Sequence, residues 1–373
     1  MKTEKPIRIL QVGMSPYYGG TESFIMNQYR KIDKSKIQFD FLNVYKEKIA
    51  CQDEIEKLGG NIYFLDMARR NGLKKYHKNL DDFFKKNHLI FDAVHCNFQS
   101  LINIDILKYA KKYGVKIRIA HSHNSGYGTE PNLIQKLIIL LNQRLIGLYA
   151  THYFACSELA ADWMFGRYAI VIKNAIDAKK FMFNESLRTK LRKELGIDDD
   201  FVLMCVGRLD PQKNPIFMLE VFKELLKIKP EAKLISIGDG VLKDEMISKI
   251  EEFGISEKVL MLGSRKDVNE LLQAADVFFL PSRFEGLGIV LIEAQAAGLP
   301  TFTSDKVVPK DVKITELLKF ISLEKPPEEW AKIISSVDVK CRRNTLTDTL
   351  DSGYDNEENA RKLQKIYLKL IGV

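Results

Sequence analysis

The chain has 373 residues, of which 46% are hydrophobic and 28% charged, and its formal net charge is +8. This length suggests two domains, and the composition excludes disordered and collagen-like classes. No apolar run approaches the roughly 20 residues of a membrane-spanning helix, and residues 1–6 do not resemble a secretory signal. The five cysteines are scattered, without a CxxC pair, so we expect a reduced, cytoplasmic protein.

Positive charge gathers in the first half of the chain. The residues concerned are Arg69, Arg70, Lys74, Lys75, Lys78, Lys85, Lys86, Lys108, Lys111, Lys112, Lys116 and Arg118. Two interpretations stay open: solvated helix faces, or a peripheral contact with an anionic membrane at the inner face of the plasma membrane. No helix-turn-helix, zinc-finger or RNP-like pattern accompanies the charge, so we do not expect a nucleic-acid partner.

Short β-rich runs alternate with segments of helical length from the first residues onward. We predict strands at Ile7 to Val12, Phe39 to Val44, Ile62 to Leu65, Ala93 to Cys96, Lys116 to Ala120 and His152 to Ala155. We predict helices at Thr21 to Lys31, Lys74 to Lys86 and Ile102 to Tyr113. A further helix from Leu133 to Leu148 has a broad apolar face, which we expect to pack in the core, with membrane docking as the alternative.

A second series of the same kind begins near residue 200. Its predicted strands are Phe201 to Val206, Lys233 to Ile237, Lys258 to Leu262, Val277 to Leu280 and Pro300 to Thr303. Its predicted helices are Pro215 to Lys227, Leu242 to Glu252, Asp267 to Gln273 and Gly288 to Ala297. The alternation predicts an α/β protein made of two Rossmann-like, doubly wound parallel-sheet domains.

We place the domain boundary near Asn174 to Lys180, which gives residues 1–173 and 174–355 as the two domains. A last helix, about Asn356 to Ile371, could pack on either domain, and we assign residues 356–373 to the N-terminal one. Because ligands of open parallel sheets bind outside the carboxyl ends of the strands, the loops that follow strands are the place to look for function.

The first such loop contains Gly19 and Gly20 directly before a predicted helix. Paired glycines there allow backbone N–H groups to approach an anion, although a tight turn capped by Thr21 is the alternative. The loop matches neither GxGxxG nor a P-loop, which argues against NAD or ATP phosphate binding of those types.

The strand that ends at Val206 continues into Gly207, Arg208 and, five residues further, Lys213, ahead of Pro215 at the start of a helix. Two fixed cations in such a loop suit a diphosphate, since arginine offers a planar fork and lysine a point charge. We favour this interpretation over a solvated loop with unrelated charges.

Two acids follow the strand that ends at Leu280. Glu285 lies in the loop, with Gly286, Leu287 and Gly288 after it, and Glu293 lies in an otherwise apolar helix. A carboxylate among apolar neighbours costs free energy unless it is paired or binds something. Because carboxylates accept hydrogen bonds from sugar hydroxyls, we interpret the pair as a sugar-binding element.

These motifs resemble those of the large retaining glycosyltransferase family 4, which has the GT-B fold with its two domains facing a central cleft. The resemblance lies in Pro-Ser-x-x-Glu285-Gly-Leu-Gly, in Glu293-Ala-x-Ala-x-Gly-Leu-Pro and in the loop from Gly207 to Asn214. Gly238-Asp-Gly240 and the segment from Ile172 to Asp177, which contains Asn174, match further family elements. The His121-Ser-His123-Asn loop is most similar to capsule and exopolysaccharide members.

The resemblance implies roles for the matched residues. Arg208 and Lys213 would neutralise the leaving diphosphate, Glu285 would hold donor sugar hydroxyls, and Glu293 the nucleotide ribose. The donor site would also include Gly19, Gly20, Asn174, Gly207, Gly238, Arg265, Gly286, Leu287 and Gly288. His121 or His123 would be the family histidine, and we favour His123 as the catalytic one because it is nearer the loop tip.

Two features of the sequence limit the assignment. Ala175 stands where the family usually has glycine, which questions a positive backbone angle there. The HxH pair has no third ligand at a convincing spacing, and the acidic run Asp198 to Asp200 precedes a strand, so we expect neither a metal site nor a cofactor.

The sequence therefore predicts a metal-independent hexosyl or N-acetylhexosaminyl transferase. We expect a nucleotide-sugar donor, with uridine preferred as the base, and a glycan or polyprenyl-linked acceptor in surface or capsular polysaccharide synthesis. A UDP-sugar 2-epimerase on the same fold, and a non-catalytic accessory subunit, remain as alternatives.

Overall fold

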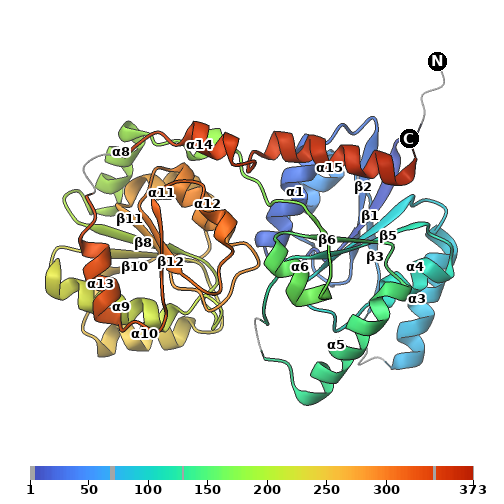
Figure 1. Cartoon of the computed structure of the whole chain (residues 1–373), viewed down its shortest axis with the longest axis horizontal. Coiled ribbons are helices and arrows are strands. Elements are labelled where there is room, and N and C mark those ends of the chain that lie inside the picture. The colour runs from blue at the N-terminus through green and yellow to red at the C-terminus, as the bar shows by residue number, and fades with distance from the viewer. Residues whose placement is uncertain (1–4, 68–71, 128–129, 339–341, 373) are drawn as a thin grey trace. The chain divides into compact units, whose positions relative to one another are not determined.

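The computed structural model describes residues 5–67, 72–127, 130–338 and 342–372 (Figure 1). The chain divides into two compact units, one of residues 1–175 with 356–373 and the other of residues 176–355. Arg69, Arg70 and Cys341 lie outside the described residues. Within the described part, none of the helices has the length and unbroken apolar composition that a bilayer-crossing helix needs.

Unit 1 is built on a parallel sheet with the strand order β3-β2-β1-β4-β5-β6-β7. The strands are β1 (Ile7–Val12), β2 (Ile37–Asn43), β3 (Ile62–Phe64), β4 (Ala93–Phe98), β5 (Ile117–Ser122), β6 (His152–Ala155) and β7 (Ile170–Val171). The helices are α1 (Gly20–Lys31), α2 (Gln52–Lys57), α3 (Leu73–Asn87), α4 (Asp105–Lys112), α5 (Leu133–Leu145), α6 (Glu158–Phe165) and α15 (Asn356–Ile371). A short 3₁₀ turn, Ile146–Leu148, follows α5.

The C-terminal helix α15 is part of this first unit and lies beside α1 (Figure 1). Its apolar stripe, formed by Ala360, Leu363 and Tyr367, is fully buried in the core of unit 1. The ring of Tyr367 meets Phe39 of β2 edge to face, with 5.9 Å between the ring centroids. The packing of an amphipathic face thus attaches a segment from the far end of the chain to the first sheet.

Unit 2 has a six-stranded parallel sheet with the order β10-β9-β8-β11-β12-β13. The strands are β8 (Val202–Val206), β9 (Lys233–Ile237), β10 (Val259–Met261), β11 (Val277–Leu280), β12 (Thr301–Ser304) and β13 (Leu318–Ile321). The helices are α7 (Ala178–Phe181), α8 (Glu185–Leu195), α9 (Pro215–Ile228), α10 (Lys243–Glu252), α11 (Val268–Ala274), α12 (Ile289–Ala296), α13 (Pro327–Ser335) and α14 (Leu346–Asp351). The prediction of two parallel-sheet α/β domains is confirmed.

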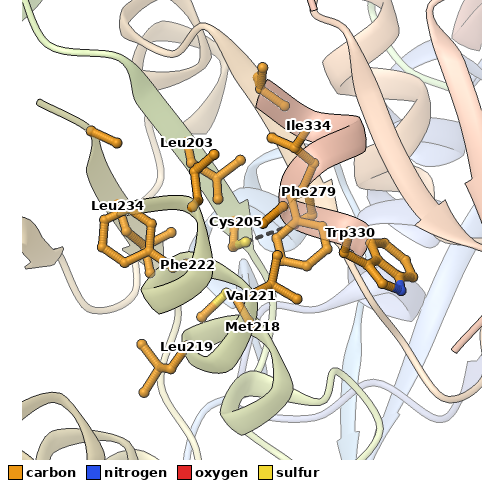
Figure 2. Close-up of a cluster of buried hydrophobic side chains, with 14 of the residues drawn as sticks. Leu203, Cys205, Met218, Leu219, Val221, Phe222, Leu234, Phe279, Trp330 and Ile334 are labelled. Atoms are coloured by element: carbon orange, nitrogen blue, oxygen red, sulfur yellow. Dashed lines mark hydrogen bonds between the residues drawn. The ribbon is translucent and has the colours of Figure 1, made fainter. Parts of the chain in front are cut away.

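The core of unit 2 lies between the sheet and helices α9 and α13 (Figure 2). Trp330 of α13 packs against Phe279 of β11, with 5.4 Å between the ring centroids, and its Nε1 donates to the carbonyl of Ser322 at 3.1 Å. The indole is therefore buried with its one donor satisfied, as a stable core requires. This packing fixes β11 beside β8, and that adjacency matters for the site.

One expectation from the sequence is wrong. Helix α5 forms where predicted, but its apolar face does not pack in the core. Of its residues only Ile139 and Asn142 are buried, whereas Leu133, Ile134 and Leu137 are 85%, 72% and 58% exposed. The periodicity of apolar residues locates a helix, but it does not decide whether the apolar stripe faces the protein.

Candidate active site

The strand order of unit 2 determines where its site lies. Strands β8 and β11 are hydrogen-bonded neighbours, yet the chain leaves β8 toward β9 on one side and leaves β11 toward β12 on the other. Outside the carboxyl ends of two such strands lies the topological switch point, where doubly wound sheets bind ligands. The loops that follow β8 and β11 are those that carry the predicted cations and the predicted acid Glu285.

The structure brings Lys213 and Glu285 into direct contact. Lys213 Nζ lies 2.5 Å from Glu285 Oε1, and the two side chains are only 17% and 5% exposed. Ser282 Oγ donates to the same carboxylate oxygen at 2.6 Å. An ammonium group has three donors, so Lys213 can bind the carboxylate and still donate to a ligand. An ammonium group and a carboxylate that can accept hydrogen bonds from hydroxyls thus lie side by side.

Arg208 extends from the same loop with a more open side chain, 65% exposed. Its guanidinium contacts Asp210 at 3.1 Å and donates to Gln212 Oε1 at 3.0 Å. Arg208 and Lys213 both line a cavity of about 20 Å³, together with residues such as Gly207 and Pro281. The two cations therefore share one end of the sheet, as a diphosphate-binding pair would.

The backbones of the loops after β8 and β9 approach each other closely. A Cβ placed on Gly238 would lie 1.8 Å from the carbonyl oxygen of Gly207, and Gly238 has a φ of +140°. A side chain is therefore excluded at this position, both by space and by backbone conformation. The requirement for glycine here explains the Gly238-Asp-Gly240 motif without any ligand.

Gly238→Ala should therefore lower the free energy of unfolding by about 2–4 kcal/mol, because the methyl group forces the two loops apart. Gly254→Ala is the matched control, since Gly254 also has a positive φ, +68°, but nothing lies within 4 Å of the position that a Cβ would take there. We expect that control to cost only about 1 kcal/mol. Urea unfolding of both variants measures the difference, and equal losses would contradict the packing argument.

Glu293 differs from Glu285 in that its carboxylate has no hydrogen bond or ion pair with a described residue. Its side chain is half-buried on α12, and the loss of water around it raises its pKa to about 7. Such a group gains from any donor that reaches it, so a ribose hydroxyl would suit it. The carboxylate of Glu293 is thus separate from the ion pair of Lys213 with Glu285.

The other matched residues of unit 2 are placed as follows. Gly288 adopts a left-handed backbone, with φ +82°, directly before α12, and its Cβ position lies 3.5 Å from Glu285 Cγ, so the backbone at Gly288 packs against the acid. Arg265 is held by Asp267 through a two-pronged contact, with Nε donating at 2.8 Å. Its loop meets the site loops through the backbone, where Gly238 N donates to the carbonyl of Gly263 at 2.8 Å.

In unit 1 the glycine loop is closed by Glu22, not capped by Thr21. Glu22 accepts from the backbone N–H groups of Ser15 at 2.9 Å and Gly19 at 3.1 Å. Gly20 has nothing within 4 Å of its Cβ position, so the space around it is open. Glu22 thus stabilises the loop that carries Gly19 and Gly20.

Asn174 lies at the end of unit 1, and its buried Oδ1 has no hydrogen-bond partner among the described residues. The replacement of glycine by Ala175 causes no strain, because the positive φ values of described non-glycine residues are confined to Cys51 and Asn214. The carbonyl of Ala175 accepts a hydrogen bond from Asn27 at 3.0 Å, which fixes the segment on α1.

The orientation of His123 follows from its neighbour Asn97 on β4. Asn97 Nδ2 donates to Gln11 Oε1 and to the carbonyl of Val12, both at 3.1 Å. Asn97 Oδ1 therefore faces His123 Nε2, 2.8 Å away, and can only accept. His123 must then carry its proton on Nε2 and present a lone pair on Nδ1, which has no partner among the described residues.

A second chain of hydrogen bonds fixes His121. Gln11 Nε2 donates to Tyr367 OH at 3.4 Å, so that hydroxyl donates to His95 Nδ1 at 2.6 Å. His95 Nε2 in turn donates to His121 Nδ1 at 3.0 Å. His121 is left with a buried N–H on Nε2 that has no partner in the described part of the chain. The ring centroids of His121 and His123 lie 4.1 Å apart. His121 thus offers a donor on Nε2, and His123 offers an acceptor on Nδ1.

Residues 188–337 match the family model "Glycosyl transferases group 1". A putative glycosyltransferase, EpsF of Bacillus subtilis, is 33% identical over 370 residues, which cover 96% of each chain. The chain belongs to the group 1 glycosyltransferases. The resemblance to family 4 is thereby confirmed, and the accessory-subunit and epimerase alternatives gain no support.

Two further comparisons agree with this family. The UDP-Gal:alpha-D-GlcNAc-diphosphoundecaprenol alpha-1,3-galactosyltransferase of Escherichia coli is 25% identical over 99% of this chain and 98% of its own. The crystal structure of Anabaena HepE in complex with UDP and glucose superimposes with a TM-score of 0.77 at 19% identity, over 97% of this chain and 100% of the other. This glycosyltransferase therefore has the GT-B fold.

Several residues of the candidate site were not predicted from the sequence. Ser282 and Gln212 position Glu285 and Arg208, and Gln212 Nε2 also binds the carbonyl of Phe284 at 3.2 Å, which joins the two site loops. In unit 1, Gln11, His95 and Asn97 are polar residues near the carboxyl ends of buried strands. That placement is a signal the sequence contains, because a buried polar side chain needs partners.

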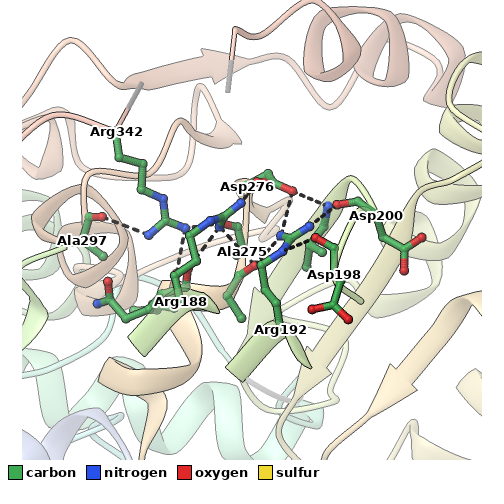
Figure 3. Close-up of polar contacts among 12 residues, drawn as sticks. Arg188, Arg192, Asp198, Asp200, Ala275, Asp276, Ala297 and Arg342 are labelled. Carbon is green, nitrogen blue, oxygen red and sulfur yellow. Dashed lines mark hydrogen bonds and ion pairs between the residues drawn. The ribbon is translucent and has the colours of Figure 1, made fainter. Parts of the chain in front are cut away.

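A larger cavity of the glycosyltransferase, about 420 Å³, lies at the opposite end of the second sheet, where β8 and β11 begin. The arginines and Asp276 of its lining are paired with one another and with backbone carbonyls (Figure 3). Asp276 binds Arg188 at 2.5 Å and Arg192 at 3.2 Å, and Arg188 also donates to the carbonyl of Ala275 at 2.6 Å. The arginines stabilise the C-terminal end of α11, so we assign this cluster to folding.

Proposed function

We propose that this glycosyltransferase moves a hexosyl or N-acetylhexosaminyl unit from a UDP-sugar to a polyprenyl-linked or glycan acceptor. The reaction would serve surface polysaccharide synthesis at the cytoplasmic face of the membrane. The observation that carries the proposal is the contact between Lys213 and Glu285 at the switch point of unit 2. The E. coli relative, named for a UDP-linked donor and a diphosphoundecaprenol acceptor, and the UDP complex of Anabaena HepE support the substrate class.

The chemistry that these residues can supply is mainly electrostatic. As the bond between the anomeric carbon and the diphosphate breaks, negative charge grows on the leaving oxygens, where Arg208 and Lys213 can neutralise it. Glu285 would accept hydroxyl hydrogens of the donor sugar, and Glu293 those of the ribose. We propose retention of configuration, with the acceptor proton passing to the departing diphosphate, so that no enzyme nucleophile is needed.

We also propose that no divalent metal takes part, because the two cations can perform the charge neutralisation. Purified full-length enzyme should release UDP from a UDP-sugar only when a GlcNAc-diphosphoundecaprenol-type acceptor is present, and EDTA should leave the rate unchanged. Donors to compare are UDP-glucose, UDP-galactose, UDP-GlcNAc, UDP-GalNAc and GDP-mannose. Turnover with GDP-mannose and with none of the UDP-sugars would contradict the proposed donor. Loss of activity in EDTA that Mn²⁺ restores would contradict metal independence. Formation of UDP-ManNAc without an acceptor would indicate an epimerase.

A further inference from the structure

Helix α5 presents an apolar surface away from the body of unit 1. This surface, which we call the α5 face, consists of Leu133, Ile134, Leu137, Leu140, Leu141, Leu145 and Leu148, each at least 38% exposed. Their spacing of three and four residues places them along one side of the helix. Six large aliphatic side chains on α5, together with Leu148 of the 3₁₀ turn that follows it, form an exposed apolar patch, and such patches mark interaction sites.

The opposite side of α5 fixes the helix to the protein. Ile139 and Ile146 are 5% and 0% exposed, and Asn142 Nδ2 donates to the carbonyl of Leu101 at 2.7 Å. The N-terminus of the helix is closed by a capping box between Asn132 and Gln135, with both hydrogen bonds at 2.9 Å. The α5 face is therefore the outer side of a well-anchored helix, and its exposure is not a consequence of fraying.

Charge around the α5 face has one dominant sign. Residues 133–148 contain no acid, and their charged residues are Lys136 and Arg144, both exposed. Lys136 contacts Glu130, just before the helix, at 3.1 Å. At the other end of the face, the exposed Lys111 of α4 donates to the carbonyl of Leu148 at 2.8 Å. Lys136 lies at the edge of the apolar strip and Arg144 within it, near its C-terminal end. Because a long cationic side chain can place its charge among headgroups while its stem lies on apolar surface, the strip complements a bilayer whose headgroups are anionic.

We propose that the α5 face docks the protein on the surface of an anionic bilayer, with the helix lying in the plane of the interface. A helix of 13 residues is about 20 Å long, too short to cross the hydrocarbon layer of about 30 Å. A second copy of the chain fits this face less well. In a two-fold pairing of antiparallel α5 helices, Lys136 and Arg144 would meet like charges, with no acid on the helix to offset them.

The docking can be tested without the transfer reaction, so its failure is distinguishable from failure of the proposed function. Full-length protein is floated with phosphatidylcholine vesicles that contain phosphatidylglycerol, and with pure phosphatidylcholine vesicles. We expect binding to the anionic vesicles only. Leu137→Gln together with Leu141→Gln should reduce the partition coefficient by roughly tenfold for each leucine, because each loses its burial in lipid.

A matched control is Leu73→Gln with Leu89→Gln, which changes two exposed leucines of unit 1 outside the α5 face, 61% and 90% exposed. This control should bind vesicles like the wild type. Absence of wild-type binding, equal binding by the α5 variant, or an α5-dependent dimer in sedimentation without vesicle binding would each overturn the proposal. Circular dichroism of the α5 variant, expected to equal that of the wild type, excludes misfolding as the cause.

Discussion

Lys213→Met should lower the rate of sugar transfer by about 10²–10³-fold, the effect expected when one preorganised group that stabilises transition-state charge is removed. The Lys213 ammonium is 17% exposed, so water screens it poorly, and it lies at the switch point where the diphosphate would leave. Methionine keeps most of the aliphatic volume over Gly207 but carries no charge. Initial rates of UDP release with a lipid-linked acceptor measure the effect.

Loss of Lys213 also leaves the carboxylate of Glu285 without its cation, and an unpaired buried charge can cost about 3–5 kcal/mol of stability. The double variant Lys213→Met, Glu285→Gln removes both charges and should fold while remaining inactive. Arg208→Ala, at a side chain 65% exposed, should retain stability and lose about 10²-fold in rate. Lys227→Met, at an exposed lysine of α9, should leave the rate unchanged. Near-normal turnover by a folded Lys213→Met enzyme would refute the site.

Stability should fall steeply as the pH drops below about 6.5, because the buried His95 and His121 and the half-buried His123 of unit 1 are held in neutral form. Burial lowers the pKa of His95 and of His123 to about 3 and lowers the pKa of His121 well below its usual value. In the unfolded chain each binds a proton near pH 6.5, whereas the folded protein does not. The contribution of these histidines to the free energy of unfolding is therefore complete above pH 6.5 and is lost progressively as the pH falls toward 3.

Each such group contributes a slope of about 1.4 kcal/mol per pH unit, so three give about 4 kcal/mol per pH unit at most. Urea unfolding at pH 7.5, 6.5 and 5.5 measures how the free energy of unfolding depends on pH. Hydrogen exchange of the β4 and β5 amides serves as the probe, so that the result reports on unit 1. His123→Asn should reduce the slope by about a third. If the free energy of unfolding did not change between pH 7.5 and 5.5, the three histidines would not be held in neutral form.

The sequence predicted most strands to within two residues, because each is a short β-branched or aromatic run bounded by turn residues. It did not predict α8, although Leu187, Leu191 and Leu195 recur there at helical spacing. The buried residue of this helix is Arg192, which binds Asp276 and a backbone carbonyl, so its main anchor is a charged side chain. The edge strand β13 was also missed, since Lys319 interrupts its four residues.

The candidate site was predicted in part. The motifs around Arg208, Lys213 and Glu285 are local, so the sequence indicated their chemistry. The contact of Lys213 with Glu285, 72 residues apart, depends on β8 lying beside β11, and this adjacency is a property of the whole sheet. The tautomers of His121 and His123 likewise depend on partners from distant segments, such as Tyr367 of the last helix for His121.

The amino-acid sequence alone determined the alternation of strands and helices, the positions of the cationic and acidic loops, and the resemblance to a glycosyltransferase family, because these features are carried by neighbouring residues. The tertiary structure decided which loops meet, which histidine nitrogen carries a proton and which side of α5 is exposed. These properties arise from packing between distant segments: burial removes water from some groups and leaves others, such as Leu133 and Leu137, facing the solvent.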